Sequence, residues 1–150
     1  MKNFTVSTPK NIKIDKKIIH SIVSKLKDNL NFKIESVNIN FVTSEQMIEI
    51  NKTYLNHNYD TDIITFNYSG SHTDLDGEIF ISVHQAIDNS LIFNVNLDSE
   101  IIRLIVHGFL HLLGYDDKKA SDKKIMKLEE DKLTENLDKH YNNLLIEYDY

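Results

Sequence analysis

The hydrophobic positions of the chain repeat with a period of two in some segments and of three to four in others, which predicts strands alternating with helices. Residues 37–42, VNINFV, alternate apolar and polar side chains as a half-buried strand does. After Asp15, which can cap a helix, apolar residues from Ile18 to Leu26 recur at intervals of three and four. The predicted strands are Phe4–Ser7, Val37–Val42, Thr61–Phe66 and Glu78–Ser82. The predicted helices cover approximately residues 15–29, 43–54, 83–91, 100–113 and 121–137.

This order of elements, β-α-β-α-β-β-α-α-α, predicts an α+β domain with a mixed sheet of about four strands covered by helices. The 150 residues suffice to bury a core, and neither an internal repeat nor a linker interrupts them. We therefore expect one compact domain over residues 1–150.

The charge balance and the apolar runs restrict the class of partner. Lysine and arginine number 17 against 23 acidic residues, a net charge of −6, so no overall field draws the chain to nucleic acid or membrane. Any RNA contact must come from a local basic patch. No apolar run approaches the roughly 18 residues of a membrane span, and the first residues lack the apolar core of a signal peptide. These features predict a soluble cytoplasmic protein with no membrane partner.

The stretch VHGFLHLLGYDD, residues 106–117, places two histidines four residues apart on a helix expected over Glu100–Leu113. We expect Asp98-Ser99-Glu100 to cap this helix at its start and Gly114 to end it. The helix is apolar nearly all round, which predicts burial, and buried imidazoles need partners for their ring nitrogens. Such pairs also occur on helices that bind no ion, but a shared metal would satisfy both rings.

His107 and His111 lie on one face of this helix, with Cβ atoms roughly 5–6 Å apart, so both can reach one metal ion. The chain has no cysteine, which excludes a thiolate site and leaves histidine and carboxylate ligands. Beyond Gly114 the chain can reverse through a left-handed turn, which brings Asp116 or Asp117 back as a third ligand. Three protein ligands leave one coordination position open, as in catalytic sites.

The motif HGFLHLLGYDD, His107–Asp117, resembles the signature His-Gly-x-Leu-His-Leu-x-Gly-Tyr-Asp-His of the YbeY-type rRNA maturation endoribonucleases. INKTYLNHNYDTDIITF, residues 50–66, and DGEIFIS, residues 76–82, resemble two further blocks of that family. The resemblance extends roughly from Asn38 to Leu133. It implies a compact α+β fold and a metal-dependent endoribonuclease that hydrolyses single-stranded RNA.

The same resemblance implies the cofactor and the partners. One Zn²⁺ per chain would be held by His107, His111 and Asp117, and a zinc-bound water would attack the phosphodiester. The substrate would be the 3′ end of 16S rRNA, and the partner the ribosome, whose quality control the family serves.

Two positions depart from the family pattern. Asp117 stands where the family has its third histidine; a carboxylate binds zinc well, but it lowers the charge of the site by one unit. Leu55 stands where the family tends to carry an arginine that could contact phosphate. The reaction would then lack one expected cation.

The residues around the histidines indicate which chemistry such a metal could support. Metalloproteases carry a glutamate base directly after the first histidine, where this chain has Gly108. Proteolysis is therefore disfavoured, whereas a metal that binds a phosphate and lowers the pKa of a water fits hydrolysis of a phosphodiester. Arg103, the only arginine, lies one turn before His107 and could contact developing charge, or form a salt bridge with Glu100.

Lysines follow the motif closely and suggest a phosphate track, although a solvated helix face explains them equally because Asp122, Glu129 and Glu130 lie nearby. They are Lys118, Lys119, Lys123, Lys124 and Lys127. Tyr115 and His57 are possible cleft residues, and Tyr115 fits core packing equally. The resemblance alone suggests that Thr61 and Asp62 lie at the edge of the cleft or along the strand that meets the substrate.

Two other functions fit the same residues. Two histidines and a carboxylate also form the facial triad of non-heme iron oxygenases, although those sites commonly lie in β-rich barrels. Alternatively, the chain is a non-enzymatic, ribosome-associated protein with a structural metal. A fourth protein ligand would favour the structural metal, and an open position would favour an enzyme.

Overall fold

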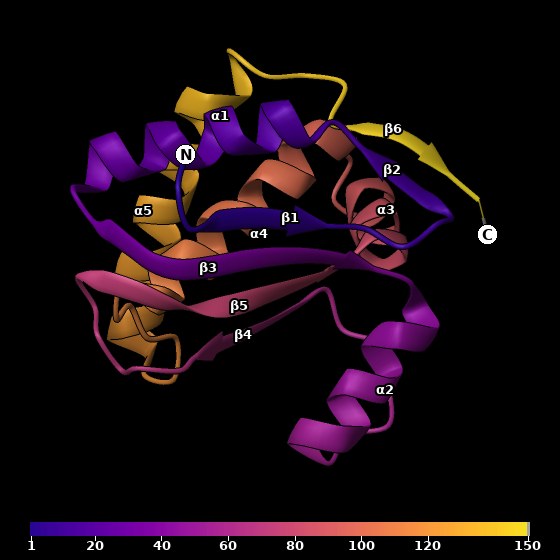
Figure 1. The fold of residues 1–150 in the computed structure, drawn as a ribbon, viewed down its shortest axis with the longest axis horizontal. Helices are drawn as coiled ribbons and strands as arrows, with labels where there is room; N and C mark the ends of the chain where they lie inside the picture. The colour runs from indigo at the N-terminus through magenta and orange to yellow at the C-terminus, as the bar shows by residue number, and fades with distance from the viewer. Residues whose placement is uncertain (150) are drawn as a thin grey trace.

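A four-stranded sheet with helices packed mainly on one face forms the body of the protein (Figure 1). This computed structural model describes residues 1–149, and within them the chain forms six strands and five helices, none long and apolar enough to cross a membrane. The strands are β1 (Phe4–Ser7), β2 (Ile12–Ile14), β3 (Lys33–Val42), β4 (Ile63–Asn67), β5 (Asp74–Ser82) and β6 (Leu145–Tyr148). The helices are α1 (Lys16–Leu30), α2 (Ser44–Leu55), α3 (Val83–Ile92), α4 (Leu97–Leu112) and α5 (Ala120–Asp138).

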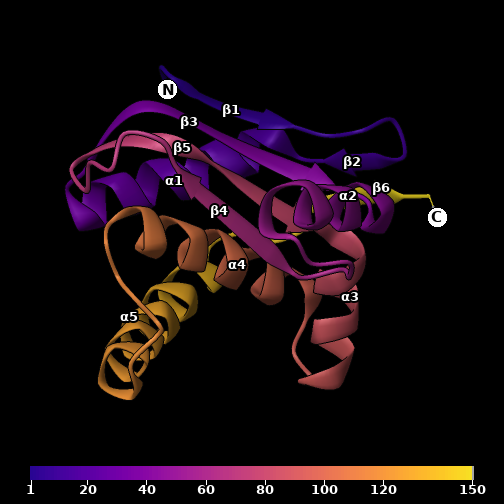
Figure 2. The ribbon, with the colours of Figure 1, turned by 90° about the horizontal axis from the view of Figure 1, so that it is seen from below.

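The strand order of the main sheet is β1-β3-β5-β4, with β1, β3 and β5 parallel and β4 antiparallel to β5. Helices α1, α3, α4 and α5 lie on one side of the sheet, and α2 lies beside the end of β3 (Figure 2). A parallel pair needs a crossover connection, which α1 supplies between β1 and β3. The predicted α+β class with a mixed sheet of about four strands is confirmed.

The period-two pattern of the strands reflects the two faces of the sheet. In β3, the side chains of Val37, Ile39 and Phe41 are buried in the core. Asn40 points to the opposite face, where its amide donates a hydrogen bond of 2.8 Å to the carboxylate of Glu78 on β5. The alternation that predicts β3 therefore separates an apolar inner face from a polar outer one.

Helix α4 is buried on most sides, which explains its nearly continuous apolar sequence. It packs against β4, β5, α3 and α5. Gly108 permits the close approach to β5, because a Cβ atom there would lie 2.9 Å from Cδ1 of Ile79. The core therefore fixes the helix that carries His107 and His111.

Two short strands and the first parts of two longer ones are not predicted from the sequence. β2 and β6 pair with each other from opposite ends of the chain, so the local pattern around each carries little signal. β3 begins at Lys33 rather than Val37, and β5 begins at Asp74 rather than Glu78. These two early segments pair with each other. That of β3 is mostly exposed and does not alternate, whereas that of β5 alternates but contains Asp76-Gly77, a dipeptide typical of turns.

The predicted N-cap of α4 is wrong. The helix begins at Leu97, and the side chain of Asn96 accepts a hydrogen bond of 3.0 Å from the N–H of Ser99. Asp98 lies in the first turn, where its carboxylate accepts hydrogen bonds from the backbone N–H groups of Asn143 and Leu144. Asparagine caps a helix as well as aspartate does. The carboxylate of Asp98 is not available as a cap, because it binds the backbone of the segment at Asn143 and Leu144.

We predict that Gly77→Ala destabilises the junction of β4 and β5. A Cβ atom at Gly77 would lie 2.2 Å from the carbonyl oxygen of Phe66, so the two strands would have to separate. We expect the free energy of unfolding in urea to fall by about 2 kcal/mol or more. Gly70→Ala is the control, because nothing lies within 4 Å of its Cβ position. Its positive φ should cost about 1 kcal/mol. Equal losses in both variants would contradict this prediction.

Candidate metal centre

His107 and His111 project from α4 with their Nε2 atoms 3.1 Å apart. The Nδ1 atom of His107 hydrogen-bonds the carboxylate of Glu130, and Nδ1 of His111 hydrogen-bonds the carbonyl oxygen of Tyr115 at 3.2 Å. Because both partners are oxygen acceptors, each neutral ring carries its proton on Nδ1 and donates it. Both Nε2 atoms then direct an unshared electron pair into the same space, where a cation would stabilise them.

Asp117 reaches the histidines because the chain reverses at Gly114. Gly114 has a φ of +98°, a conformation that favours glycine. Its N–H donates to the carbonyl oxygen of His111, and the N–H of Tyr115 donates to that of Leu110, both at 3.0 Å. These two bonds form a Schellman motif, and Gly114 ends the helix as predicted. Beyond the turn, Oδ2 of Asp117 lies 3.5 Å from Nε2 of His111.

The three side chains fit a divalent metal ion. One donor atom from each lies within 4.8 Å of the other two. Two ligands at about 2.0–2.1 Å from a tetrahedral zinc are about 3.3–3.4 Å apart, close to the separations of 3.1 and 3.5 Å found here. The sequence left Asp116 and Asp117 as alternatives, and the carboxylate of Asp116 instead accepts a hydrogen bond from the N–H of Lys118. Asp117 is therefore the candidate third ligand.

The environment of His111 favours the neutral ring that binds metals. Burial lowers the pKa of His111, protonation of the adjacent His107 would lower it further, and Asp117 has the opposing effect. A proton therefore competes less well with a metal ion for this ring. Asp117 is 46% exposed, so the third donor is at the solvent-facing side of the group.

Glu130 belongs to the candidate metal centre, although it is not among the site residues predicted from the sequence. Its side chain, 4% exposed, reaches from α5 to Nδ1 of His107. Burial raises the pKa of Glu130, but the hydrogen bond and charge of His107, with the charges of Arg103 and Lys127, outweigh it, so the net pKa is lowered. An ionised carboxylate in this position fixes the tautomer and orientation of a metal-binding imidazole. One local signal could have found it: Glu130 lies four residues after Met126 and three before Leu133, so it is an acidic residue on the buried stripe of α5.

Arg103 is held by carboxylates. Its guanidinium lies 2.6 Å from Glu100, 3.4 Å from Glu130 and 3.8 Å from Asp62. The hydrogen bond with Glu100 raises the pKa of Arg103, and this effect together with the surrounding carboxylates exceeds the opposing effect of burial. Of the two roles expected from the sequence, the salt bridge with Glu100 is present. Arg103 thereby connects α4 to α5 and to the segment before β4.

Two grooves meet at the candidate ligands. The α5 groove, a cleft of about 1120 Å³, extends along α5, and the β4 groove, of about 570 Å³, extends along β4. His107, Asp117 and Asp62 line both grooves. A metal ion bound to the three ligands could therefore be reached along either groove.

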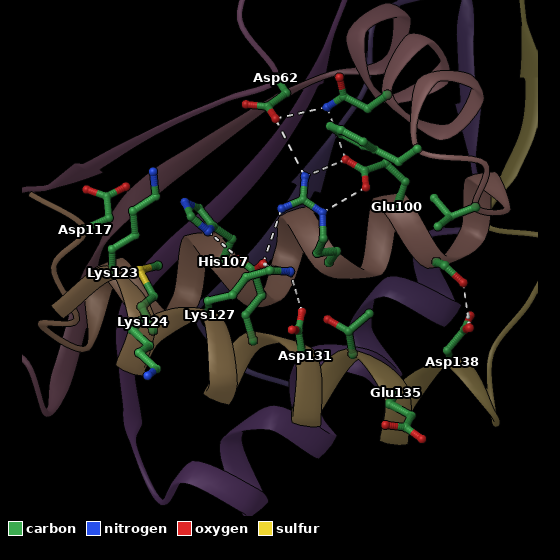
Figure 3. Close-up of a pocket in the computed structure, with 18 of the residues that line it drawn as sticks. Asp62, Glu100, His107, Asp117, Lys123, Lys124, Lys127, Asp131, Glu135 and Asp138 are labelled. Carbon is green, nitrogen blue, oxygen red and sulfur yellow. Dashed lines mark hydrogen bonds and ion pairs between the residues drawn. The ribbon is translucent and has the colours of Figure 1, made fainter. Parts of the chain in front are cut away.

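Charge changes sign along the α5 groove (Figure 3). Three lysines lie toward the end near Asp117, and three exposed acidic residues line the rest of α5, beyond the buried Glu130. They are Lys123, Lys124 and Lys127, followed by Asp131, Glu135 and Asp138. A polyanion would therefore be attracted at the end of the groove that holds the candidate ligands.

Only some of the lysines predicted to contact RNA lie in this groove. Lys123 lines it, whereas Lys118 and Lys119 lie in the exposed segment before α5 and line neither groove. Lys127 lines the groove but is paired with Asp131 at 2.6 Å. Lys123 and Lys124 are thus the better placed to meet a phosphate.

The β4 groove contains three residues that the sequence suggested for a cleft. His57, Thr61 and Asp62 line it, together with Leu55. Tyr115 instead packs against the core. Leu55 stands where the family tends to carry an arginine. It lies in the groove but presents an apolar side chain there.

Known proteins resemble this chain over most of its length. A family model described as endoribonuclease YbeY matches residues 2–138. The endoribonuclease YbeY of Karelsulcia muelleri is 46% identical over 98 residues, 65% of this chain and 69% of that protein. The endoribonuclease YbeY of Azobacteroides pseudotrichonymphae is 35% identical over 124 residues, 83% of this chain and 88% of that protein. A solution structure of a Thermotoga maritima protein has the same fold, with a TM-score of 0.67 and 23% identity over 89% of this chain and 88% of that one.

We predict that Asp117→Ala lowers zinc occupancy about tenfold or more, because losing a ligand costs at least as much as losing a residue that hydrogen-bonds a ligand. Asp116→Ala is the matched control and should retain the metal, since its carboxylate bonds the backbone of Lys118. Metal content would be measured by mass spectrometry after dialysis against zinc. Loss of metal in Asp116→Ala, with retention in Asp117→Ala, would show that the third ligand is misassigned.

We predict that Glu130→Ala weakens zinc affinity about 10- to 100-fold by releasing the ring of His107. Glu130→Gln should lose less, because its amide oxygen can still accept the Nδ1 hydrogen bond. Asp131→Ala is the control, since this neighbouring carboxylate pairs with Lys127 and is 55% exposed. Affinity would be measured by competition with a chromophoric chelator, and circular dichroism would verify folding. Unchanged affinity in folded Glu130→Ala would exclude this orienting role.

Proposed function

Because this chain belongs to the YbeY endoribonuclease family, we propose that it is a metal-dependent hydrolase of phosphodiester bonds in single-stranded RNA. We propose further that its substrate is the 3′ end of 16S rRNA and that it serves ribosome maturation and quality control in the cytoplasm. The observation that carries this proposal is the convergence of His107, His111 and Asp117 where two grooves meet.

The donor set supports one Zn²⁺ per chain. Two imidazole nitrogens and one carboxylate oxygen are ligands that zinc accepts, and the rings already present Nε2 toward each other. Within residues 1–149, the group contains these three donors and no fourth histidine or acidic residue. This supports an open catalytic site over a closed structural one. When bound, the ion would act as a Lewis acid and lower the pKa of a water.

The residues of the chain prepare this site and restrict its chemistry. Glu130 holds the ring of His107, and the carbonyl oxygen of Tyr115 holds that of His111, so both present Nε2 without rearrangement. Gly108 supplies no general base beside the first histidine, which disfavours peptide hydrolysis. Lys123 and Lys124 supply positive charge for phosphates in the α5 groove.

The position of Arg103 bears on transition-state stabilisation. Its guanidinium already interacts with Glu100, Glu130 and Asp62. We therefore propose that Arg103 is a positioning residue that acts through Glu130 and does not contact the phosphate. With Leu55 in the β4 groove, charge developing on the phosphate would depend mainly on the metal ion.

Family membership supports this function over the two alternatives from the sequence. The donor set alone also fits the facial triad of a non-heme iron oxygenase. A structural metal in a ribosome-associated binding protein would require a closed shell, and the described residues supply three donors. RNA hydrolysis accounts for both the open donor group and the relatives.

We predict that the zinc-loaded protein cleaves unpaired RNA spanning the 3′ end of 16S rRNA and that chelation abolishes cleavage. Zinc added in excess of the chelator should restore the activity, because the ligands stay in place. His111→Ala, with one ligand removed, is the control and should remain inactive after zinc is added. Cleavage would be measured on end-labelled RNA, with a duplex of the same sequence for comparison. Full activity of metal-free protein, or equal cleavage of the duplex, would contradict the proposal.

A further inference from the structure

Four exposed apolar side chains lie together where α3 ends and the chain turns toward α4. We call them the apolar tip; they are Leu91, Ile92, Phe93 and Val95, which are between 43% and 74% exposed. In the described residues 1–149, no other run of consecutive residues exposes three large apolar side chains. Exposed apolar side chains scattered singly need no explanation, but a contiguous group marks an interaction site.

Backbone hydrogen bonds and a buried asparagine hold the apolar tip in a fixed conformation. The N–H of Phe93 donates to the carbonyl oxygen of Asn89 at 2.9 Å, and the N–H of Val95 donates to that of Ser90 at 3.0 Å. The buried side chain of Asn89 donates a hydrogen bond of 3.2 Å to Glu100 on α4. Because the backbone of the tip is already ordered, a partner that covers it loses less conformational entropy on binding.

The apolar tip forms one side of the α5 groove, and α5 forms the other. Phe93 and Val95 line this groove together with Met126 of α5. In Figure 2, α3 and α5 project from the same side of the molecule, and α4 runs between them. The hydroxyl of Ser99 on α4 donates a hydrogen bond of 2.6 Å to Asp138, which ties the end of α5 to the start of α4. The groove therefore has helical walls held together at its floor.

Acidic side chains line the α5 side of this part of the groove. Asp131, Glu135 and Asp138 recur at intervals of four and three along α5, so they lie on one face of that helix. We call them the acidic row, and Figure 3 shows them following α5 away from Lys123 and Lys124. Within residues 1–149, neither Glu135 nor Asp138 forms an ion pair with a lysine or arginine. The row therefore offers unbalanced negative charge to a partner.

The chemistry of this part of the groove indicates what it binds. Its negative charge would repel RNA phosphates and anionic lipid headgroups, whereas its apolar side chains favour a partner that removes them from water. A helix with an apolar stripe and basic flanks matches both features, and hydrophobic grooves commonly accept such helices. We propose that the apolar tip and the acidic row dock a basic amphipathic helix of another protein, an inference that does not rest on the proposed function.

The charge of the whole chain disfavours a second copy as the occupant. The chain has a net charge of −6, so two copies repel each other, most strongly where an acidic surface of one would be covered by the other. A partner with a basic helix is attracted to the same surface. Lys123 and Lys124, at the other end of the groove, remain outside this docking surface.

The test uses a synthetic helical peptide of about 18 residues, five turns of helix, with leucine on one face and lysine on the other. A second peptide keeps the leucines and carries glutamate in place of every lysine. Binding of each labelled peptide to the full-length protein would be measured by fluorescence anisotropy at low ionic strength. We expect the lysine peptide to bind at least about tenfold more tightly, because its charge complements the acidic row.

Variants of exposed apolar residues test the apolar tip. Ile92→Ser/Phe93→Ser should weaken binding of the lysine peptide about tenfold or more, because it removes two apolar anchors. Ile125→Ser/Leu128→Ser is the matched control, since it removes two exposed apolar side chains of α5 that do not line the groove. This control should stay within about twofold of the parent. Circular dichroism would verify folding, and Leu91→Ser provides the same test if the tip double variant unfolds.

Variants of exposed acidic residues test the acidic row. Asp131→Asn/Glu135→Gln should weaken binding of the lysine peptide about threefold or more and reduce its dependence on salt concentration, because two attracting charges are lost. Glu49→Gln/Glu147→Gln is the matched control, since it removes the same charge from exposed positions outside the groove. This control should also stay within about twofold of the parent.

Amide chemical shifts of the isotopically labelled protein give an independent measure of where the lysine peptide binds. We expect shift changes at the apolar tip and along the acidic row. Losses of affinity as large in the control variants as in the groove variants, or shift changes confined to other surfaces, would overturn the proposal. It would also be overturned if the tip variant weakened RNA binding while peptide binding stayed unchanged, or if it dissolved a dimer of the parent in sedimentation velocity. None of these measurements uses RNA cleavage, so the proposed function stands or fails separately.

Discussion

The approach of α4 to β5 is the packing interaction on which the metal centre depends. Gly108 lets α4 lie against Ile79 of β5, and Gly77 of β5 lies against Phe66 of β4 and Leu112 of α4. These two glycines let α4, β4 and β5 pack at distances that a single added Cβ atom would increase. The candidate ligands on α4 and the opposite wall of the β4 groove are thereby positioned by the same packing.

Around this interaction, buried charge connects the helices. Burying a charge is costly unless the charge is paired. Arg103 forms ion pairs with Glu100, Glu130 and Asp62. Lys127 adds a second cation 3.9 Å from Glu130 but shares it with Asp131, so the carboxylates still outnumber the cations and negative charge remains beside the histidines. A divalent cation at the ligands would balance it, whereas a phosphate would be repelled from the acidic part of the α5 groove.

The sequence predicts the parts of this protein whose signals are local. The two-residue alternation in β3, the apolar stripe of α1 and the glycine at the end of α4 lie within one turn or one strand, so each is predicted close to its observed position. The two histidines four residues apart are also a local signal, because they lie on one turn of the same helix. Asp117 follows them directly after the turn at Gly114. These signals also suffice for the α+β class.

What the sequence does not predict is set by interactions between distant segments. Glu130 is 23 residues from the imidazole that it holds, and although its place on the buried stripe of α5 marks it as unusual, nothing local names His107 as its partner. Asp98 looks like a cap, but the segment at Asn143 engages its carboxylate.

The pairing of β2 with β6 bears on the order in which the protein assembles. Ile12 pairs with Tyr148, so closing this small sheet encloses nearly the whole chain in one loop, at an entropic cost that grows with the logarithm of loop length. The β4–β5 pair and α4 are joined by short connections and can form without it. The metal centre therefore does not depend on β2 and β6 meeting first. We expect their pairing, with the entry of Ile12 and Ile14 into the core, to come late, because contacts between remote segments form slowly.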